Sequence, residues 1–335
     1  MFLAHQILDA IKNDDKEALI DFIINIDISL TIESVNQFEK DSFLWNSPPL
    51  ISICCFYGAI KCFEYLCLCD ADIYKPDLKG YLPVHFASAG GKIEICDILD
   101  SLGADFSIHS DENIHDCIHL AAKYGRIDLI QRFYLRNFDL NTISNFIDFT
   151  PLQLAIYDKH VDVVQYLCEK GCVIDKTSII IAYNSIKKCY YYINKNKNDS
   201  PNKNNLNYEK EQQEFHRCLK MMSIFCDFGF DAKIESNNGL TLLLDSSSLG
   251  YSDLAICLIS NKCENVNQEE KNGGWTALHF AAENGDLKLT KELIKNGAEI
   301  NKPSKSKMTA THIAVNRGHN DVVQYLMKHC GVVFI

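Results

Sequence analysis

The chain has 335 residues, of which 47% are apolar and 23% are charged. This balance supplies enough apolar surface for a folded core and excludes wholesale disorder. The net charge of −11 argues against general binding to nucleic acid or to an anionic membrane, because both are polyanions. The charge is uneven, since residues 1–175 carry −14 and residues 176–335 carry +3.

The cysteine content and the N-terminus predict a reducing compartment. The 15 cysteines are odd in number and include no C-x-x-C pair. The opening MFLAHQILDA lacks the basic and apolar regions of a secretory signal, and the longest apolar stretch, 50–60, is shorter than the roughly 18 residues of a membrane span. We therefore expect reduced thiols in a cytoplasmic protein, with a nuclear location as the alternative.

A unit of 33 or 34 residues recurs along the chain. Its clearest copy is GWTALHFAAENGDLKLTKELIKNGAEIN, residues 274–301, and the next begins 33 residues later. Each copy contains a short helix pattern, a glycine and a second apolar helix pattern. The same frame places one anchor residue per unit at Pro49, Leu82, Asp116, Thr150, Thr241, Thr276 and Thr309.

Each recurring position has a physical reason. Thr at the anchor caps the first helix, and Pro in the next position, as in Thr150-Pro151, suits the first helical turn. Small residues five and six positions on, such as Ala281 and Ala282, let the second helix approach closely. Glycine at plus nine ends the first helix in a left-handed conformation. It is present as Gly58, Gly91, Gly125, Gly250, Gly285 and Gly318.

This unit resembles the ankyrin repeat, whose signature is G-x-T-P-L-H-x-A-A-x-x-G-H followed by an apolar helix. The resemblance implies an all-α ankyrin-repeat solenoid of stacked helix pairs with short β-turn fingers. It covers nearly the whole chain as about nine units, of which three are degenerate.

The domain organisation follows from where the frame is interrupted. Residues 1–24 are predicted to form an N-terminal capping repeat, with Asp14 in the glycine position, and 25–45 an ordered insertion, because apolar residues are frequent there. Ankyrin repeats are expected at 46–186 and 214–335, as one continuous solenoid. The stretch 187–213 between them is predicted to be a disordered insertion, because its Asn/Lys-rich centre has almost no apolar residues.

The cysteines between positions 54 and 69 raise the possibility of a zinc site. Structural zinc requires ligands that converge at one point, whereas Cys54, Cys55, Cys62 and Cys67 fall at packing positions of one repeat. Free cysteine behaves as a small apolar residue. We therefore expect no metal and no cofactor, and we expect chelators to leave folding unchanged.

The histidines do not predict catalysis. His85, His119, His279 and His312 all lie at plus three, where the ankyrin resemblance implies a structural bond between neighbouring repeats. Cys117 near His119 would need a cleft and a third orienting group to act as a nucleophile. No phosphate-binding, dinucleotide-binding, protease or kinase motif is present, so no enzymatic activity is expected.

The resemblance implies that a partner protein binds the concave face, at minus one, plus seven and plus eight of each unit. Tyr, Trp and Phe are frequent at these positions, as in interface hot spots, although some could simply hold one finger to the next. The predicted contacts are Tyr57, Tyr81, Tyr124, Phe149 and Tyr157, with the acidic residues Asp77, Asp111, Glu112, Asp148 and Asp158. Because the strip is acidic, we expect a partner with a basic segment.

A second candidate surface lies near the C-terminus, around Trp275 and Met308. Its lysines would favour an acidic ligand, and they are Lys271, Lys305 and Lys307. The final residues, Val333-Phe334-Ile335, have a form that edge-strand-binding domains accept, although covering the last helix pair is the favoured interpretation.

These patterns predict a monomeric, non-catalytic scaffold or adaptor for protein–protein interaction. The alternative is a substrate-recognition subunit of a ubiquitin ligase. That function needs a segment that docks the ligase, for which 25–45 is the available stretch.

Overall fold

The computed structural model describes residues 2–23, 42–108, 115–144, 148–199, 206–230, 234–236, 239–261 and 265–329. The chain folds as two compact units, Met1–Val173 and Ile174–Ile335. Within the described residues the regular structure is helical, apart from an isolated bridge between Glu235 and Thr241. The predicted all-α fold is confirmed, whereas a single continuous solenoid stays a prediction.

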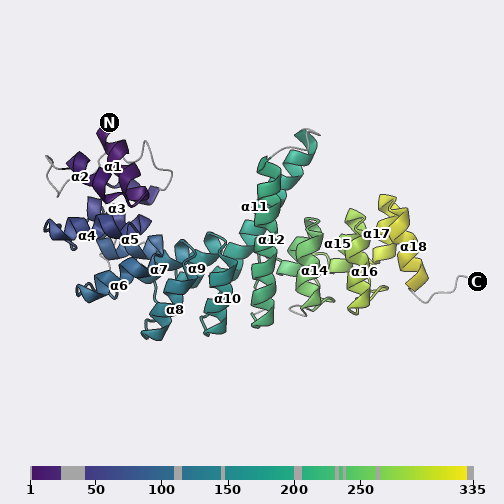
Figure 1. The fold of residues 1–335 in the computed structure, drawn as a ribbon. Coiled ribbons are helices and arrows are strands. Elements are labelled where there is room, and N and C mark those ends of the chain that lie inside the picture. The colour runs from purple at the N-terminus through teal and green to yellow at the C-terminus, as the bar shows by residue number, and fades with distance from the viewer. Residues whose placement is uncertain are drawn as a thin grey trace, which may run out of the picture. The chain divides into compact units, whose positions relative to one another are not determined.

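The described residues of the N-terminal unit form five consecutive helix pairs (Figure 1). The first helices, which we call inner, pack against one another in series, and each is followed by an outer helix. A short 3-10 helix, η2 (Ser42–Trp45), precedes the second pair. The pairs are α1 (Phe2–Lys12) and α2 (Lys16–Ile23), α3 (Leu50–Tyr57) and α4 (Ile60–Leu68), α5 (Pro83–Gly90) and α6 (Ile93–Ser101), α7 (Cys117–Lys123) and α8 (Ile127–Leu135), and α9 (Pro151–Tyr157) and α10 (Val161–Glu169).

In the part of the C-terminal unit that the structure describes there are four helix pairs, the first of which is far longer than the others (Figure 1). They are α11 (Lys176–Asp199) and α12 (Leu206–Asp227), α13 (Leu242–Ser248) and α14 (Ser252–Ser260), α15 (Ala277–Asn284) and α16 (Leu287–Lys295), and α17 (Ala310–Arg317) and α18 (Asn320–His329). The outer helices α12, α14, α16 and α18 pack in that order.

The helix ends follow the predicted local chemistry. Thr150 caps α9 by accepting the backbone N–H of Gln153 at 3.2 Å, and Thr241 caps α13 in the same way. All six predicted glycines have φ between 68° and 77°, the left-handed region that a helix C-terminus needs. Asp14 takes this conformation in the first pair, with φ of 50°.

The fingers between pairs are tight turns closed by backbone hydrogen bonds. The N–H of Asp77 donates to the carbonyl of Tyr81 at 3.0 Å, and the N–H of Ser304 donates to Met308 at 2.9 Å. Neighbouring fingers are also joined, since the N–H of Lys305 donates to the carbonyl of Gly273. The carbonyl of the residue before the anchor is therefore occupied within its own finger.

The predicted bond between neighbouring repeats is confirmed for two of the four histidines, His119 and His279, whereas Nε2 of His85 has no hydrogen-bond partner among the described residues. Nε2 of His119 lies 3.1 Å from the carbonyl of Thr142, and Nε2 of His279 lies 3.2 Å from that of Met308. A second set of bonds comes from the residue at plus ten, where Nε2 of His160 lies 2.8 Å from the carbonyl of Lys123. Each repeat is thus tied to its neighbour through polar groups that would otherwise be unsatisfied.

The expectation that residues 187–213 are disordered is wrong for the part that the structure describes. Helix α11 continues to Asp199, and α12 begins at Leu206. The apolar spacing of the first helix continues beyond its expected end, because Ile186, Cys189 and Ile193 are all buried. Two lengthened helices that pack on each other satisfy their backbone groups internally, as a loop would not. Residues 200–205 lie outside the described residues.

The insertion predicted at 25–45 is described only from residue 42 onward. Phe43 and Leu44 of η2 are buried, so this end of the insertion packs into the N-terminal unit. The C-terminal Val333-Phe334-Ile335 lies outside the described residues. No described helix is both long enough and apolar enough to cross a membrane.

Candidate partner-binding face

The candidate face in the N-terminal unit is formed by the fingers and by the C-terminal ends of the inner helices. Tyr57 ends α3, Tyr124 directly follows α7 and Tyr157 ends α9. Tyr57 and Tyr124 are half-buried, whereas Tyr157 is 62% exposed. The repeat frame therefore places all three at equivalent helix ends, as the sequence predicted, but with unequal access to a partner.

An aromatic cluster fills the part of this face that is formed by α3, α5 and α7. Its centre is Phe43 of η2, whose ring centroid lies 4.7 Å from that of Phe86, 5.9 Å from that of Tyr124 and 6.3 Å from that of Phe56. Phe56 also contacts Tyr124 at 6.3 Å. Phe43 thus packs against aromatic side chains of α3 and α5 and reaches Tyr124 at the end of α7.

Tyr81 and Asp77 do not lie on an accessible surface, which corrects their assignment as partner contacts. Each is 6% exposed. The hydroxyl of Tyr81 accepts the backbone N–H of His115 in the next finger at 3.3 Å, and its ring packs 4.8 Å from Phe43. Tyr81 therefore joins one finger to the next.

Asp77 has a structural role in its finger. Its Oδ1 accepts the N–H groups of Lys79 and Tyr81, both at 2.8 Å. Burial raises the pKa of the carboxyl, while the backbone donors act in the opposite direction. The sequence pattern D-x-K-G before the anchor is that of an Asx turn, which could have identified this role.

The remaining predicted residues of the N-terminal unit lie around α9. Asp148 and Asp158 are exposed, and Phe149 is half-buried in the finger that precedes this helix. Asp148 adopts a positive φ of 54° at the tip of its turn. Asp111 and Glu112 lie outside the described residues. The accessible part of the predicted strip is therefore short and acidic.

At the second candidate surface, around Trp275 in the C-terminal unit, Lys271 is paired with an acidic side chain. Trp275 is half-buried, with its ring 5.1 Å from that of Phe280 and 6.0 Å from that of His279. Lys271 pairs with Glu235 at 2.6 Å, and Nζ of Lys305 donates to the carbonyl of Lys271. The ion pair with Glu235 reduces the positive charge that Lys271 offers to an acidic ligand, whereas the bond of Lys305 to a neutral carbonyl leaves its charge in place.

The buried thiols are poorly suited to nucleophilic chemistry. Burial raises the pKa of Cys117 to about 12, so the thiolate is scarce at neutral pH, although His119 is near in sequence. Cys54, Cys55 and Cys62 are buried, and burial raises the pKa of Cys62 to about 12 as well. These cysteines pack as apolar residues, as their repeat positions predicted.

The sequence interpretation missed two features of this face. Phe43 was recognised as part of an ordered insertion but not as a residue that fills the groove. Trp45, at the end of η2, is 48% exposed and was not considered as a contact. No local spacing links η2 to α5 and α7, so only the tertiary contacts reveal the arrangement.

Comparison with protein families agrees with this architecture. The family model described as ankyrin repeats matches residues 101–178, 118–205, 211–304 and 285–333, which together cover more than half of the chain. A crystal structure of the human ASB11 ankyrin repeat domain aligns over 98% of both chains, with 16% identity and a TM-score of 0.40.

Three curated proteins illustrate how widely such repeats occur. The chain is 23% identical over 323 residues to alpha-latroinsectotoxin-Lt1a of Latrodectus tredecimguttatus, covering 87% of this chain and 22% of the toxin. It is 44% identical over 54 residues to the Notch-regulated ankyrin repeat-containing protein of Xenopus tropicalis, covering 16% and 47%. It is 29% identical over 96 residues to human BCL-6 corepressor-like protein 1, covering 29% and 5%.

The chain thus spans less than half of the length of each of these relatives. The match of the family model to more than half of the sequence shows that the chain belongs to the ankyrin-repeat family, whose repeats form protein–protein interaction domains.

Proposed function

We propose that this chain is a non-catalytic scaffold whose protein partner binds the N-terminal unit over the ends of α7 and α9. The observation that carries the proposal is the exposure of Tyr157, which is 62% accessible at a groove position. A tyrosine offers a large, rigid contact area, and interface hot spots are rich in such side chains. The groove over α3 and α5 is less suited, because Phe43 already occupies it.

The charge around Tyr157 favours a partner with a basic segment. Asp148 and Asp158 are both exposed beside the proposed contact, and the surrounding half of the chain carries the negative charge. Lys or Arg side chains of a partner would be steered by these carboxylates and could stack on the tyrosine ring. Raising the ionic strength should therefore weaken binding.

The cysteines support a reducing compartment for this interaction. None of the thirteen cysteines that the structure describes forms a disulfide. We infer a cytoplasmic or nuclear scaffold that acts as a monomer, and sedimentation of the purified chain would test the oligomeric state.

Selection of binding peptides from a displayed random library on the full chain would test the site. We expect enriched peptides to contain Lys or Arg, and we expect Tyr157→Ala and Tyr124→Ala each to weaken binding by about 2 kcal/mol. Tyr134→Ala is the matched control, because this exposed tyrosine lies on the outer helix α8 of the same unit. Asp158→Asn should weaken binding more than Asp162→Asn on α10.

The opposite pattern would place the site elsewhere. If Tyr157→Ala and Tyr124→Ala leave peptide affinity unchanged while Trp275→Ala abolishes it, the partner binds the C-terminal unit. Enrichment of acidic peptides would contradict the proposed charge of the partner.

A further inference from the structure

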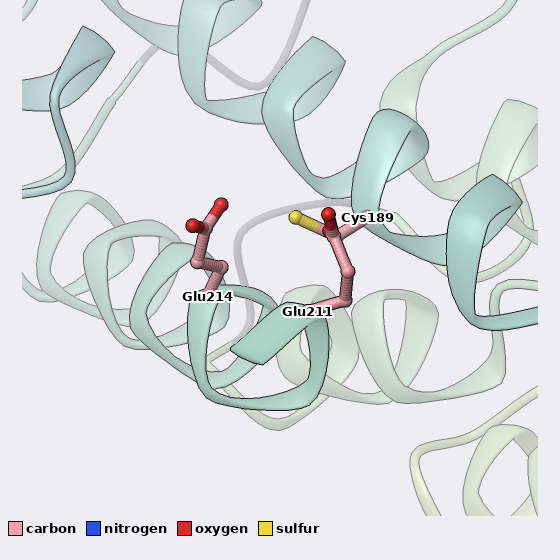
Figure 2. A group of neighbouring side chains, drawn as sticks. All are labelled: Cys189, Glu211 and Glu214. Carbon is pink, nitrogen blue, oxygen red and sulfur yellow. The ribbon is translucent and has the colours of Figure 1, made fainter. Parts of the chain in front are cut away.

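A group of three potential metal ligands lies between the two long helices α11 and α12. The side chains of Cys189, Glu211 and Glu214 converge on one another (Figure 2). The Sγ atom and one carboxylate oxygen from each glutamate all lie within 4.8 Å of one another. No other such group of three His, Cys, Asp or Glu side chains occurs in the part of the chain that the structure describes.

The helix pair brings these side chains together from distant parts of the sequence. Cys189 belongs to the buried face of α11, between Ile186 and Ile193, and is 2% exposed. Glu211 and Glu214 are three residues apart on α12, so they project from the same face of that helix, and both are half-buried. The thiol is held by the core, while the two carboxylates approach it from the edge of the helix pair.

This combination of donors has a definite metal preference. Two glutamates three positions apart repel each other when both are ionised, and a divalent cation between them would offset that repulsion. A thiolate is a soft ligand that calcium and magnesium avoid and that zinc accepts. One sulfur and two carboxylate oxygens leave the fourth tetrahedral position of a zinc ion to water or to another ligand.

The separations are compatible with coordination after a small adjustment. With a Zn–S distance of about 2.3 Å and Zn–O distances of about 2.0–2.2 Å, tetrahedral donors would lie roughly 3.3–3.7 Å apart. The present separations are at most 4.8 Å, so they exceed the upper end of this range by no more than about one ångström. Rotation of the two half-buried glutamate side chains can close that gap without moving Cys189.

We propose that Cys189, Glu211 and Glu214 bind a divalent cation of the zinc class and that the ion clips α11 to α12. On binding, the Cys189 thiol loses its proton to solvent and its sulfur forms the bond to the metal. The ion would hold the pair together just beyond the point where Lys187 and Tyr183 contact Asp245 of the next repeat. This site is independent of the proposed partner-binding face, which lies in the other unit.

Cobalt binding to the reduced full-length chain tests the site directly. After removal of metals with a chelator, Co²⁺ is added, and a cobalt–thiolate charge-transfer band is followed in the near ultraviolet. We expect one equivalent of Co²⁺ to produce the band and Zn²⁺ to displace it. Cys189→Ser should abolish the band, and Glu211→Gln or Glu214→Gln should weaken binding at least tenfold.

Two control variants separate this site from unspecific binding to other thiols or acids. Glu209→Gln changes an exposed acidic residue on the same helix, and Cys168→Ala changes a buried cysteine of α10. Both should bind cobalt as the unaltered chain does. Equal helix content of all metal-free variants by circular dichroism would show that they remain folded.

A second readout reports on the clip itself. Zinc should slow amide hydrogen exchange around residues 189–193 in the unaltered chain but not in Cys189→Ser. The proposal is overturned if micromolar Co²⁺ gives no thiolate band, or if the band persists unchanged in Cys189→Ser and in both glutamate variants.

Discussion

The lengthened pair α11/α12 and the regular pair α15/α16 both pack on neighbouring helix pairs, but their helices differ greatly in length. The regular helices have 8 and 9 residues, whereas α11 and α12 have 24 and 22. At 1.5 Å per residue, the helices of the regular pair are about 13 Å long and those of the lengthened pair about 35 Å. Figure 1 shows the long pair extending beyond the neighbouring helices of its unit. A repeat can thus accept an insertion by lengthening both helices together.

The two pairs also differ in how they are tied to the next repeat. In the regular pair, His279 bridges to the carbonyl of Met308. In the lengthened pair, the hydroxyl of Tyr183 donates to the buried carboxylate of Asp245 at 2.6 Å, with Nζ of Lys187 at 3.4 Å. The stacking of helix pairs is thus the same in both cases, while the polar side chains that join a pair to the next repeat differ.

The largest effect is expected from a comparison of two core positions within the lengthened pair. Phe225, at the level of the repeat stack, is fully buried, and Ile193 is buried in the extension. Phe225→Ala should lower the free energy of unfolding by about 4 kcal/mol, because it leaves a cavity in the shared core. Ile193→Ala should lower it by less than about 1 kcal/mol, because the extension can open locally.

Denaturant unfolding measures the global loss in both variants, and hydrogen exchange measures the local opening. An equal loss in the two variants would show that the extension belongs to the cooperative core.

An intermediate effect per residue is expected from acid, which acts on two buried histidines of the regular repeats. Burial lowers the pKa of His85 to about 4 and that of His115 to about 4, compared with about 6.5 in an unfolded chain. Between these values the unfolded state binds more protons, so stability is full above pH 6.5 and falls as the pH drops towards 4. Each group should cost on the order of 3 kcal/mol by the end of this range.

A His85→Gln variant isolates one of these groups. Gln153 already takes this position in another repeat of the same unit, where its Oε1 accepts the N–H of Thr150 at 3.0 Å. The variant should lose less stability than the unaltered chain between pH 6.5 and 4, as measured by urea unfolding at each pH. His312→Gln, at an exposed position, is the control. An unchanged pH dependence in His85→Gln would contradict this explanation.

The smallest effect is expected when the tip of the lengthened pair is removed. Replacing residues 194–207 with a short Gly/Ser linker should leave the free energy of unfolding within about 1 kcal/mol, because loop closure entropy changes only logarithmically with length. Thermal and denaturant unfolding test this. A large loss, or a transition that is no longer cooperative, would mean that the tip contributes to the folded core.

Much of the fold could be predicted because repeat positions report local physics. Thr150 and Gly285 mark helix ends through a cap and a left-handed backbone, and Ala281 and Ala282 mark a close helix contact. The disorder expected for 187–213 is wrong in the described residues of this stretch, where the composition is polar but the helical spacing of apolar residues persists. Ile186, Cys189 and Ile193 continue the helical period into a stretch that otherwise looks polar.

The candidate face was only partly predictable for a related reason. The frame identifies Tyr57, Tyr81 and Tyr157 as groove or finger positions, but it contains no information on what covers them. Tyr81 is buried because Phe43 packs on it, and Tyr157 is exposed.

The sequence by itself determined the repeat frame, the helix pairs and the family, because caps, glycines and apolar spacing act over a few residues. The tertiary structure decided which aromatic side chains remain accessible, and it brought Cys189 to Glu211 and Glu214. Those outcomes depend on contacts between segments far apart in the chain. Such contacts form only when whole helices pack, and no local pattern encodes them.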